Sequence, residues 1–228
     1  MKTSRRTFLV TAAAGAGAAT ILPYAGLAAA HSSNMFETAA GDITVHPVSH
    51  ASFVMETPVG TIYVDPVGEE SAYSDFPAPD LILLTHEHGD HLNRQTLNAL
   101  MGDETHLITK PAYNTTPERE NFHPQGRDNG YVLSFDGFRV YISGDTEDIP
   151  EMRALENIDL AFVCMNLPFT MDAEQAAGGV SAFGPTYVYP YHYRGRDGGT
   201  QDPEEFASLL RDGIEVKMGD WYAEGELG

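Results

Sequence analysis

The chain of 228 residues has a single cysteine, Cys164, so no disulfide can form within it. Cys164 lies in an apolar run, residues 160–165, where a buried structural thiol is expected rather than a nucleophile. No serine stands in surroundings that indicate a covalent nucleophile either. If this chain is an enzyme, its chemistry has to come from other side chains.

Basic residues are scarce as well, since 13 lysines and arginines stand against 33 aspartates and glutamates, a formal net charge of −20. An acidic surface repels phosphate backbones, which disfavours a nucleic-acid partner. The hydrophobic fraction of 42% and the aromatic fraction of 10% argue against disorder. The composition therefore indicates a folded acidic domain, for which a small-molecule substrate is the expected partner.

Apolar runs long enough to matter for a membrane are confined to the first 30 residues. Arg5 and Arg6 precede Phe8 and Leu9, and an Ala-rich stretch follows as far as residue 30. This pattern is similar to a twin-arginine export signal, with small residues at a plausible cleavage point. We expect residues 1–30 to be a signal peptide and residues 31–228 to be one exported domain, periplasmic or extracellular, without a stable membrane span. The alternative is a signal that is retained as an anchor.

Runs of β-branched, aromatic and aliphatic residues, bounded by Pro and Gly, predict a series of short strands. The predicted strands are residues 43–45, 52–55, 61–64, 81–84, 106–109, 131–135, 138–142, 159–165, 186–189 and 214–218. Helices are predicted at residues 94–101, 172–177 and 203–211. Each half of the chain starts with a hairpin and continues with alternating strands and helices. Two sheets face to face, with the helices outside them, are the expected arrangement.

The hexapeptide His86-Glu87-His88-Gly89-Asp90-His91 follows the continuously apolar strand 81–84. His86 and His88 are two residues apart, so in an extended segment they point to the same side and can bind one ion. Asp90 and His91 can face a second ion. Imidazole and carboxylate are ligands that suit zinc and similar divalent metals.

Four ligands do not complete a site for two metals, so others have to come from further along the chain. His123 lies in the long polar loop 110–130, Asp145 follows the second hairpin, and His192 follows a strand. Strand ends and long loops are where sites form on such scaffolds.

The ordered set Asp65, His86–His91, His123, Asp145 and His192 resembles the metallo-β-lactamase superfamily, over essentially the whole chain after the signal. Ser49-His50-Ala51 is similar to the Gly-His-Ala found near the start of lactonase-like members. The resemblance implies an α/β fold, a four-layer αβ/βα sandwich of two mixed β-sheets with outer helices.

The resemblance also implies a site for two divalent metal ions, with zinc expected and manganese or iron as alternatives. One metal would be held by His86, His88 and His123, and the other by Asp90, His91 and His192. Asp145 would bridge the two, and Asp90 and Asp145 would be the catalytic carboxylates. Asp65 would orient a ligand through a hydrogen bond, and His50 would line the site.

The implied function is hydrolysis of an ester, lactone or phosphoester by a hydroxide that bridges the metals, formed because the pKa of the shared water falls towards roughly 7. Asp145 and the lack of a cysteine ligand disfavour a true β-lactamase, and His88 disfavours a diiron flavoprotein, where glutamate is usual. A mononuclear iron enzyme similar to persulfide dioxygenases and a metal-binding protein without catalysis stay open. Arg194 and Arg196 could bind a carboxylate or phosphate of the substrate.

Overall fold

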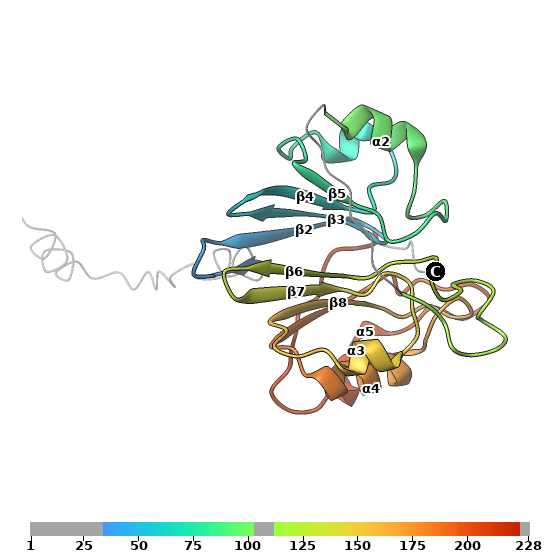
Figure 1. The fold of residues 1–228 in the computed structure, drawn as a ribbon. Coiled ribbons are helices and arrows are strands. Elements are labelled where there is room, and N and C mark those ends of the chain that lie inside the picture. Colours follow the sequence, from blue (N-terminus) through green and yellow to red (C-terminus); the bar gives the residue numbers. More distant parts are fainter. Residues whose placement is uncertain (1–33, 103–111, 224–228) are drawn as a thin grey trace, which may run out of the picture. The chain divides into compact units, whose positions relative to one another are not determined.

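Ten strands form two five-stranded sheets in residues 34–102 and 112–223, the part of the chain that the computed structural model describes (Figure 1). The first sheet has the order β1-β2-β3-β4-β5, with strands Met35–Phe36, Ile43–Ser49, Ser52–Thr57, Gly60–Val64 and Leu81–Leu83. The second has the order β10-β9-β8-β7-β6. In chain order from β6, its strands are Tyr131–Phe135, Phe138–Ile142, Leu160–Cys164, Tyr187–Tyr191 and Glu215–Val216. Both sheets are mixed, because each joins antiparallel hairpins to parallel neighbours.

The hairpin β6–β7 illustrates how local sequence sets the fold. Its two turn residues, Asp136 and Gly137, have φ values of 48° and 97°. Positive φ at both central residues is what a type I′ turn requires, and Asp-Gly is a preferred pair for it. The predicted hairpin is therefore present, with Phe135 paired to Phe138.

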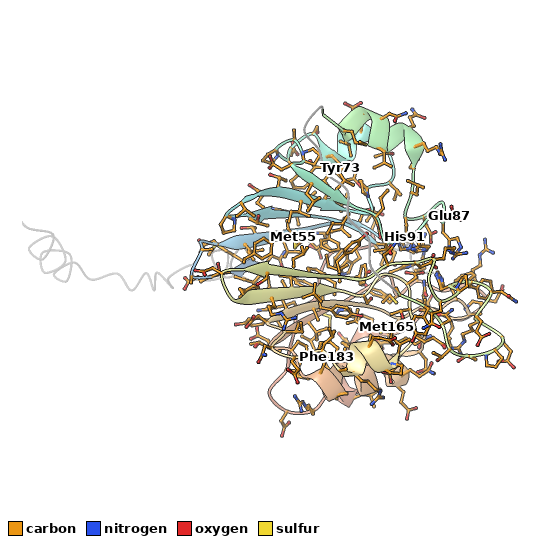
Figure 2. All side chains as sticks on the ribbon, in the orientation of Figure 1. Met55, Tyr73, Glu87, His91, Met165 and Phe183 are labelled. Atoms are coloured by element: carbon orange, nitrogen blue, oxygen red, sulfur yellow. The ribbon has the colours of Figure 1, made fainter. Side chains whose placement is uncertain are left out.

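Aromatic side chains fill the space between the two sheets. The ring of Phe53 on β3 stacks on Phe162 of β8 with centroids 4.2 Å apart, and Phe162 stacks in turn on Tyr189 at 5.2 Å. Met55 also lies between the sheets (Figure 2). Every residue of β8 is buried, as expected for a strand covered on both faces.

Helices cover the two outer faces (Figure 1). The 3₁₀ helix η2 (Glu70–Tyr73) and α2 (Arg94–Leu100) lie on the first sheet, where Leu97 and Leu100 pack against a buried cluster that includes Tyr63 and Ile82. The helices α3 (Pro150–Arg153), α4 (Ala173–Phe183) and α5 (Pro203–Leu209) lie on the second sheet. The predicted four-layer sandwich is thus confirmed. None of the helices between residues 34 and 223 that the structure describes combines the length and the apolarity needed to cross a bilayer.

Helix α4 extends six residues beyond its predicted end at residue 177. It begins with a capping box between Asp172 and Gln175 and ends at Gly184, whose φ is 57°. Gly178 and Gly179 discourage a helix in isolation. Tertiary packing explains Gly179, because a Cβ at that position would lie 2.7 Å from Asp148 Oδ1 and 2.9 Å from the sulfur of Met152.

Other predicted elements match with small shifts at their ends, and the last strand is shorter than expected, covering only Glu215–Val216. The strand β1 and the helices η2 and α3 were not predicted. The predicted strand 106–109 and the signal peptide 1–30 lie outside the described residues.

Candidate metal centre

Strand ends deliver the predicted site residues to one edge of the two sheets. Asp65 directly follows β4, the hexapeptide 86–91 follows β5, Asp145 follows β7, and His192 directly follows β9. His91 lies at the end of the sheets where the connecting loops gather (Figure 2). His123 arrives from the loop between α2 and β6, where its carbonyl accepts a hydrogen bond from Asn114 N at 2.8 Å.

The side chains meet in three groups whose possible ligand atoms lie within 4.8 Å of one another. These groups are His86, His88 and His123; His86, His91 and Asp145; and His50, Asp90 and His192. The first group is the ligand set implied for one metal. The third group differs from the ligand set implied for the second metal. His50 lies beside Asp90 and His192 in place of His91, which is grouped with His86 and Asp145.

The Asp145 carboxylate lies at the centre of the site. Its oxygens are 3.4 Å from His91 Nε2, 3.5 Å from His123 Nε2 and 3.3 Å from His192 Nε2. His123 belongs to the first implied metal group, and His91 and His192 belong to the second. The structure therefore brings all seven predicted ligands together, with Asp145 touching both groups.

Two buried polar atoms at this centre, His91 Nε2 and Asp145 Oδ1, have no hydrogen-bond partner among the described residues, and they face each other at 3.4 Å. If Asp65 accepts the proton of His91 Nδ1, the other ring nitrogen presents a lone pair to a carboxylate oxygen. Such an arrangement is costly unless a cation lies between the two atoms. The donor set therefore fits a divalent metal ion.

The pKa values of two histidines, His86 and His192, also favour a metal. Burial lowers the pKa of His86 to about 2 and that of His192 to about 4, so both rings are neutral and keep a lone pair for a metal. His91 differs: burial acts to lower its pKa, but Asp145 and Asp65 outweigh burial and raise the value to about 9. Without a metal the ring therefore carries a proton between the two carboxylates, and a bound cation would take the place of that proton. Burial opposes ionisation of Asp145, yet the surrounding histidines hold its pKa well below the usual range.

Asp65 is fully buried and lies 2.8 Å from His91 Nδ1. It also accepts hydrogen bonds from the backbone N–H of Thr85 at 2.7 Å and from the Thr85 hydroxyl at 2.6 Å. These contacts fix both the carboxylate and the ring of His91. Asp65 therefore stands where it can orient a ligand.

Several supporting residues were missed by the sequence analysis. Asp128 lies 3.0 Å from His123 Nδ1, Asn166 Nδ2 lies 3.1 Å from the His192 ring nitrogens, and Tyr222 Oη lies 2.8 Å from His50 Nδ1. Asp128 is five residues from His123 in the same polar loop, so that pair could have been suspected. Tyr222 is 172 residues from His50, and no local pattern indicates their contact.

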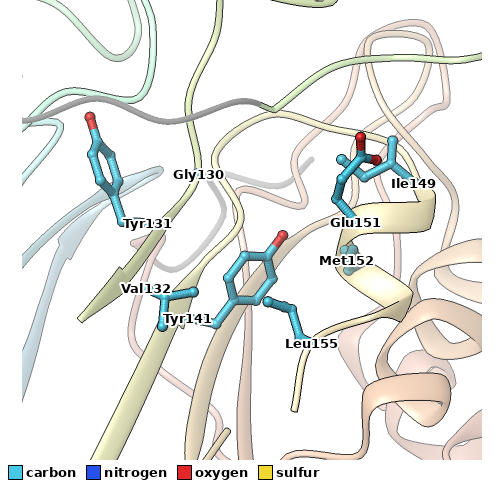
Figure 3. A pocket seen from close by; sticks show the side chains of 8 residues that line it. All are labelled: Gly130, Tyr131, Val132, Tyr141, Ile149, Glu151, Met152 and Leu155. Atoms are coloured by element: carbon cyan, nitrogen blue, oxygen red, sulfur yellow. The ribbon is translucent and has the colours of Figure 1, made fainter. Parts of the chain in front are cut away.

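A cavity of about 330 Å³ opens beside the His50, Asp90 and His192 group, and it is also lined by Ser49, Val67, Asn166, Phe169, Arg194, Gly195 and Arg196. Both predicted substrate-binding arginines thus share one cavity with candidate ligands. A second cavity of about 130 Å³, shown in Figure 3, contains none of the predicted site residues. Its walls are apolar except for Glu151 and the tyrosine hydroxyls.

The chain is similar to several known proteins. A family model described as a beta-lactamase superfamily domain matches residues 44–192, a span that contains all seven predicted ligands. A metal-dependent hydrolase of Pyrococcus furiosus is 28% identical over 179 residues, which cover 62% of this chain and 79% of that protein.

Solved structures agree with the family match. The crystal structure of a candidate metal-dependent hydrolase from Parabacteroides distasonis is 38% identical, with a TM-score of 0.74, and the match covers 82% of this chain and 98% of that chain. A metallo hydrolase from the archaeon Ignicoccus hospitalis, 21% identical, shares the fold with a TM-score of 0.59 over 76% of this chain and 94% of that chain. With its sandwich of two mixed sheets and a family match over most of its length, the chain belongs to the metallo-β-lactamase superfamily.

Proposed function

We propose that this chain is a metal-dependent hydrolase that holds two divalent ions and cleaves an ester, lactone or phosphoester. One observation carries the proposal. A buried carboxylate, Asp145, lies within 3.5 Å of nitrogens from three histidines of two adjoining groups, and one of its oxygens has no hydrogen-bond partner among the described residues. The names of the relatives from Pyrococcus furiosus and Parabacteroides distasonis support the same class of reaction.

In this proposal His86, His88 and His123 hold one ion, and Asp90, His91 and His192 hold the other, with Asp145 between them. His50 lies 3.3 Å from Asp90 Oδ2 and borders the second position. When bound, zinc or a similar divalent ion supplies Lewis acidity and lowers the pKa of water towards about 7. Zinc is the metal we expect, because imidazole nitrogens dominate the donor set.

The protein's own side chains then have three tasks. Asp65 and Asp128 hold the rings of His91 and His123 through their Nδ1 atoms, which leaves each Nε2 directed at the centre. Asp90, whose side chain is half exposed, forms the boundary between the buried ligands and the cavity. The Asp145 carboxylate supplies negative charge at the point where the metal ions would be held by the surrounding imidazoles.

A covalent mechanism through the one thiol is disfavoured. Cys164 is fully buried in β8, and burial together with Asp145 raises its pKa to about 12. The thiolate needed for nucleophilic attack is therefore not available near neutral pH. Attack by water is the remaining route that the site supports.

Export is a separate part of the proposal, carried only by the sequence of residues 1–30. Replacing both arginines (Arg5→Lys with Arg6→Lys) should leave the precursor in the cytoplasm if the twin-arginine route is used. Normal export of that double variant would contradict the proposal.

The central test measures metal content and turnover in Asp145→Asn. We expect the purified wild-type chain to hold two zinc or manganese ions and to hydrolyse at least one compound from a panel of lactones, phosphodiesters and acyl esters. Asp145→Asn should lose metal and activity while keeping its far-ultraviolet circular dichroism. Asp136→Asn is the matched control, because Asp136 is exposed in the turn at the other end of β7.

Other outcomes would favour the alternatives. A single iron per chain with oxygen-dependent turnover would replace hydrolysis by oxidation. A fully metallated protein that turns over none of the panel would favour metal binding without catalysis. Unchanged metal content and activity in Asp145→Asn would rule out the bridging role of that carboxylate.

A further inference from the structure

Residues of different chemistry line the cavity of about 330 Å³. The candidate ligands His50, Asp90 and His192 form one part of its wall, and Arg194, Gly195 and Arg196 form another part. Its volume is at the lower end of the range for small-molecule sites. A molecule that occupies it would therefore meet the metal-binding groups and the arginine loop together.

Arg196 is a cation that lines the cavity without a carboxylate partner among the described residues. Three other arginines of this acidic chain are paired with carboxylates, in Arg119–Glu147, Arg127–Asp128 and Arg153–Asp148. Arg196 forms no ion pair with any carboxylate of the described residues. Its guanidinium carbon instead lies 5.8 Å from the centroid of the Phe169 ring. An arginine packed against an aromatic face keeps its N–H groups available for an oxyanion in the plane of the guanidinium.

The ring that supports Arg196 is itself fixed. The Phe169 backbone donates to Asn166 O at 3.0 Å, and its carbonyl accepts from Asn114 Nδ2 at 2.7 Å. Phe122 meets the Phe169 ring edge-on at 5.2 Å. Phe169 and Asn166 both line the cavity. Because Asn166 also contacts His192, Phe169 connects Arg196 with the candidate ligand His192.

The backbone of the arginine loop is held equally closely. Arg196 N donates to Leu167 O at 3.0 Å, and Gly199 N donates to Arg196 O at 2.7 Å. A Cβ on Gly195 or Gly199 would lie 2.2 or 2.1 Å from Leu167 O, so only glycine permits this approach. The backbone position of Arg196 is therefore set before a ligand arrives, which reduces the part of the binding entropy that ordering the loop would cost.

Arg194 has a different environment. Its guanidinium lies 5.3 Å from the Tyr222 ring centroid, and its backbone N–H donates to the Tyr222 hydroxyl at 3.2 Å. The same hydroxyl contacts His50 Nδ1. Arg194 thus packs on a ring that contacts His50 and is not part of the cavity lining, whereas Arg196 packs on Phe169, which lines the cavity. Arg196 is therefore the arginine that we assign to ligand recognition.

We propose that Arg196 binds an oxyanion on the substrate, so that the substrate is a small molecule with a carboxylate or phosphate apart from the bond that is cleaved. The inference rests on the proposed function in one respect, namely that the reacting bond lies at the His50, Asp90 and His192 wall. Carboxylate and phosphate both present two oxygens to a guanidinium, so either satisfies this geometry.

The test is calorimetric binding of small probes to the full-length, metal-loaded protein, in which no bond is broken. The probes are succinate, 3-phosphonopropionate and the monoamide succinamate, which has one anionic end only. We expect wild type to bind at least one dianion about tenfold or more tightly than succinamate, as a charge-assisted pair implies. The dianion that binds more tightly identifies the oxyanion.

Arg196→Gln should bind each dianion no more than about twofold more tightly than succinamate. Its affinity for succinamate should equal that of wild type, which would show that the metal-binding part of the cavity is intact. Arg94→Gln is the matched control, because Arg94 is an exposed arginine at the start of α2 that also lacks an ion pair with any described carboxylate. It should behave like wild type.

Full discrimination in Arg196→Gln, or no discrimination or no binding in wild type, would overturn the proposal. Discrimination that depends on Arg196 in a protein without any hydrolytic turnover would leave this anion site standing and would remove the proposed function instead. The two ideas can therefore fail separately.

Discussion

The contact between Asp65 and His91 makes a specific prediction for the variant Asp65→Asn. The carboxylate accepts two hydrogen bonds from Thr85 and lies 2.8 Å from His91 Nδ1, with no exposure to solvent. An amide has one accepting oxygen, so its NH₂ group has to face a donor, either on Thr85 or on the ring of His91. The variant therefore leaves a buried donor unpaired or turns His91 to the wrong tautomer.

The magnitude follows from these contacts. An unpaired buried polar group costs about 1–3 kcal/mol of unfolding free energy. Loss of a residue that orients a metal ligand lowers metal affinity by roughly 10–100-fold, or about 1.4–2.7 kcal/mol. We expect Asp65→Asn to show both effects, because the same carboxylate supports the strand end and the ligand.

Competition with a coloured zinc chelator would measure the affinity, and urea unfolding of the metal-free protein would measure stability. Asp80→Asn is the control, since Asp80 also accepts a backbone hydrogen bond, from Thr61 N at 2.7 Å, at the other end of β4. The control should keep the wild-type metal affinity. If Asp65→Asn bound zinc as tightly as wild type, Asp65 would not be the group that orients His91.

Two further predictions concern the core and the metal. Phe53→Ala removes a fully buried ring that stacks on Phe162 and should cost about 3–5 kcal/mol in urea unfolding. Phe53→Leu keeps most of the buried volume without the ring and should cost less; equal losses in the two variants would show that the cost comes from the ring stack rather than from buried volume. Removal of metal by a chelator should lower the melting temperature, because only the folded chain assembles the centre. Added zinc should restore it, by an amount equivalent to about 2.7 kcal/mol when free zinc is at a hundredfold excess over the dissociation constant. A melting temperature that responds to neither treatment would exclude a bound metal as a stabilising ligand.

The sequence predicted the parts of the centre that depend on strand ends. The hexapeptide 86–91, Asp145 and His192 each follow a strand, and each of these strands is recognised in the sequence as a short apolar run. Once the strands are known, they also predict the sheet edge at which these residues meet. The family model and the related structures confirm the superfamily and the sandwich fold.

Contacts between distant segments could not be predicted in this way. Asn166 reaches His192 over 26 residues, and Tyr222 reaches His50 over 172 residues. Neither residue type is unusual in its local sequence. The pairing of His50 with Asp90 also depends on how the β2–β3 turn folds back over the site, which no local pattern specifies.

Three residues of the candidate metal centre have a strained backbone that folding alone does not require. His50, Asp65 and His192 each come directly after a strand and have φ values of 56°, 43° and 47°. The left-handed conformation costs roughly 1–2 kcal/mol for a residue with a side chain, and glycine would remove that cost.

Local hydrogen bonds offset part of this strain. The backbone of His50 donates to Trp221 O at 3.1 Å, and that of Asp65 donates to Leu83 O at 2.9 Å. Glycine could form the same backbone bonds with less strain, so the bonds alone do not explain a histidine or an aspartate at these turns. What glycine cannot provide is the imidazole or carboxylate that each turn directs back over the sheet edge, where Asp65 meets His91 and where His50 and His192 meet Asp90. The strained turns are therefore best understood as the means by which three separate strands hold their polar side chains at one centre.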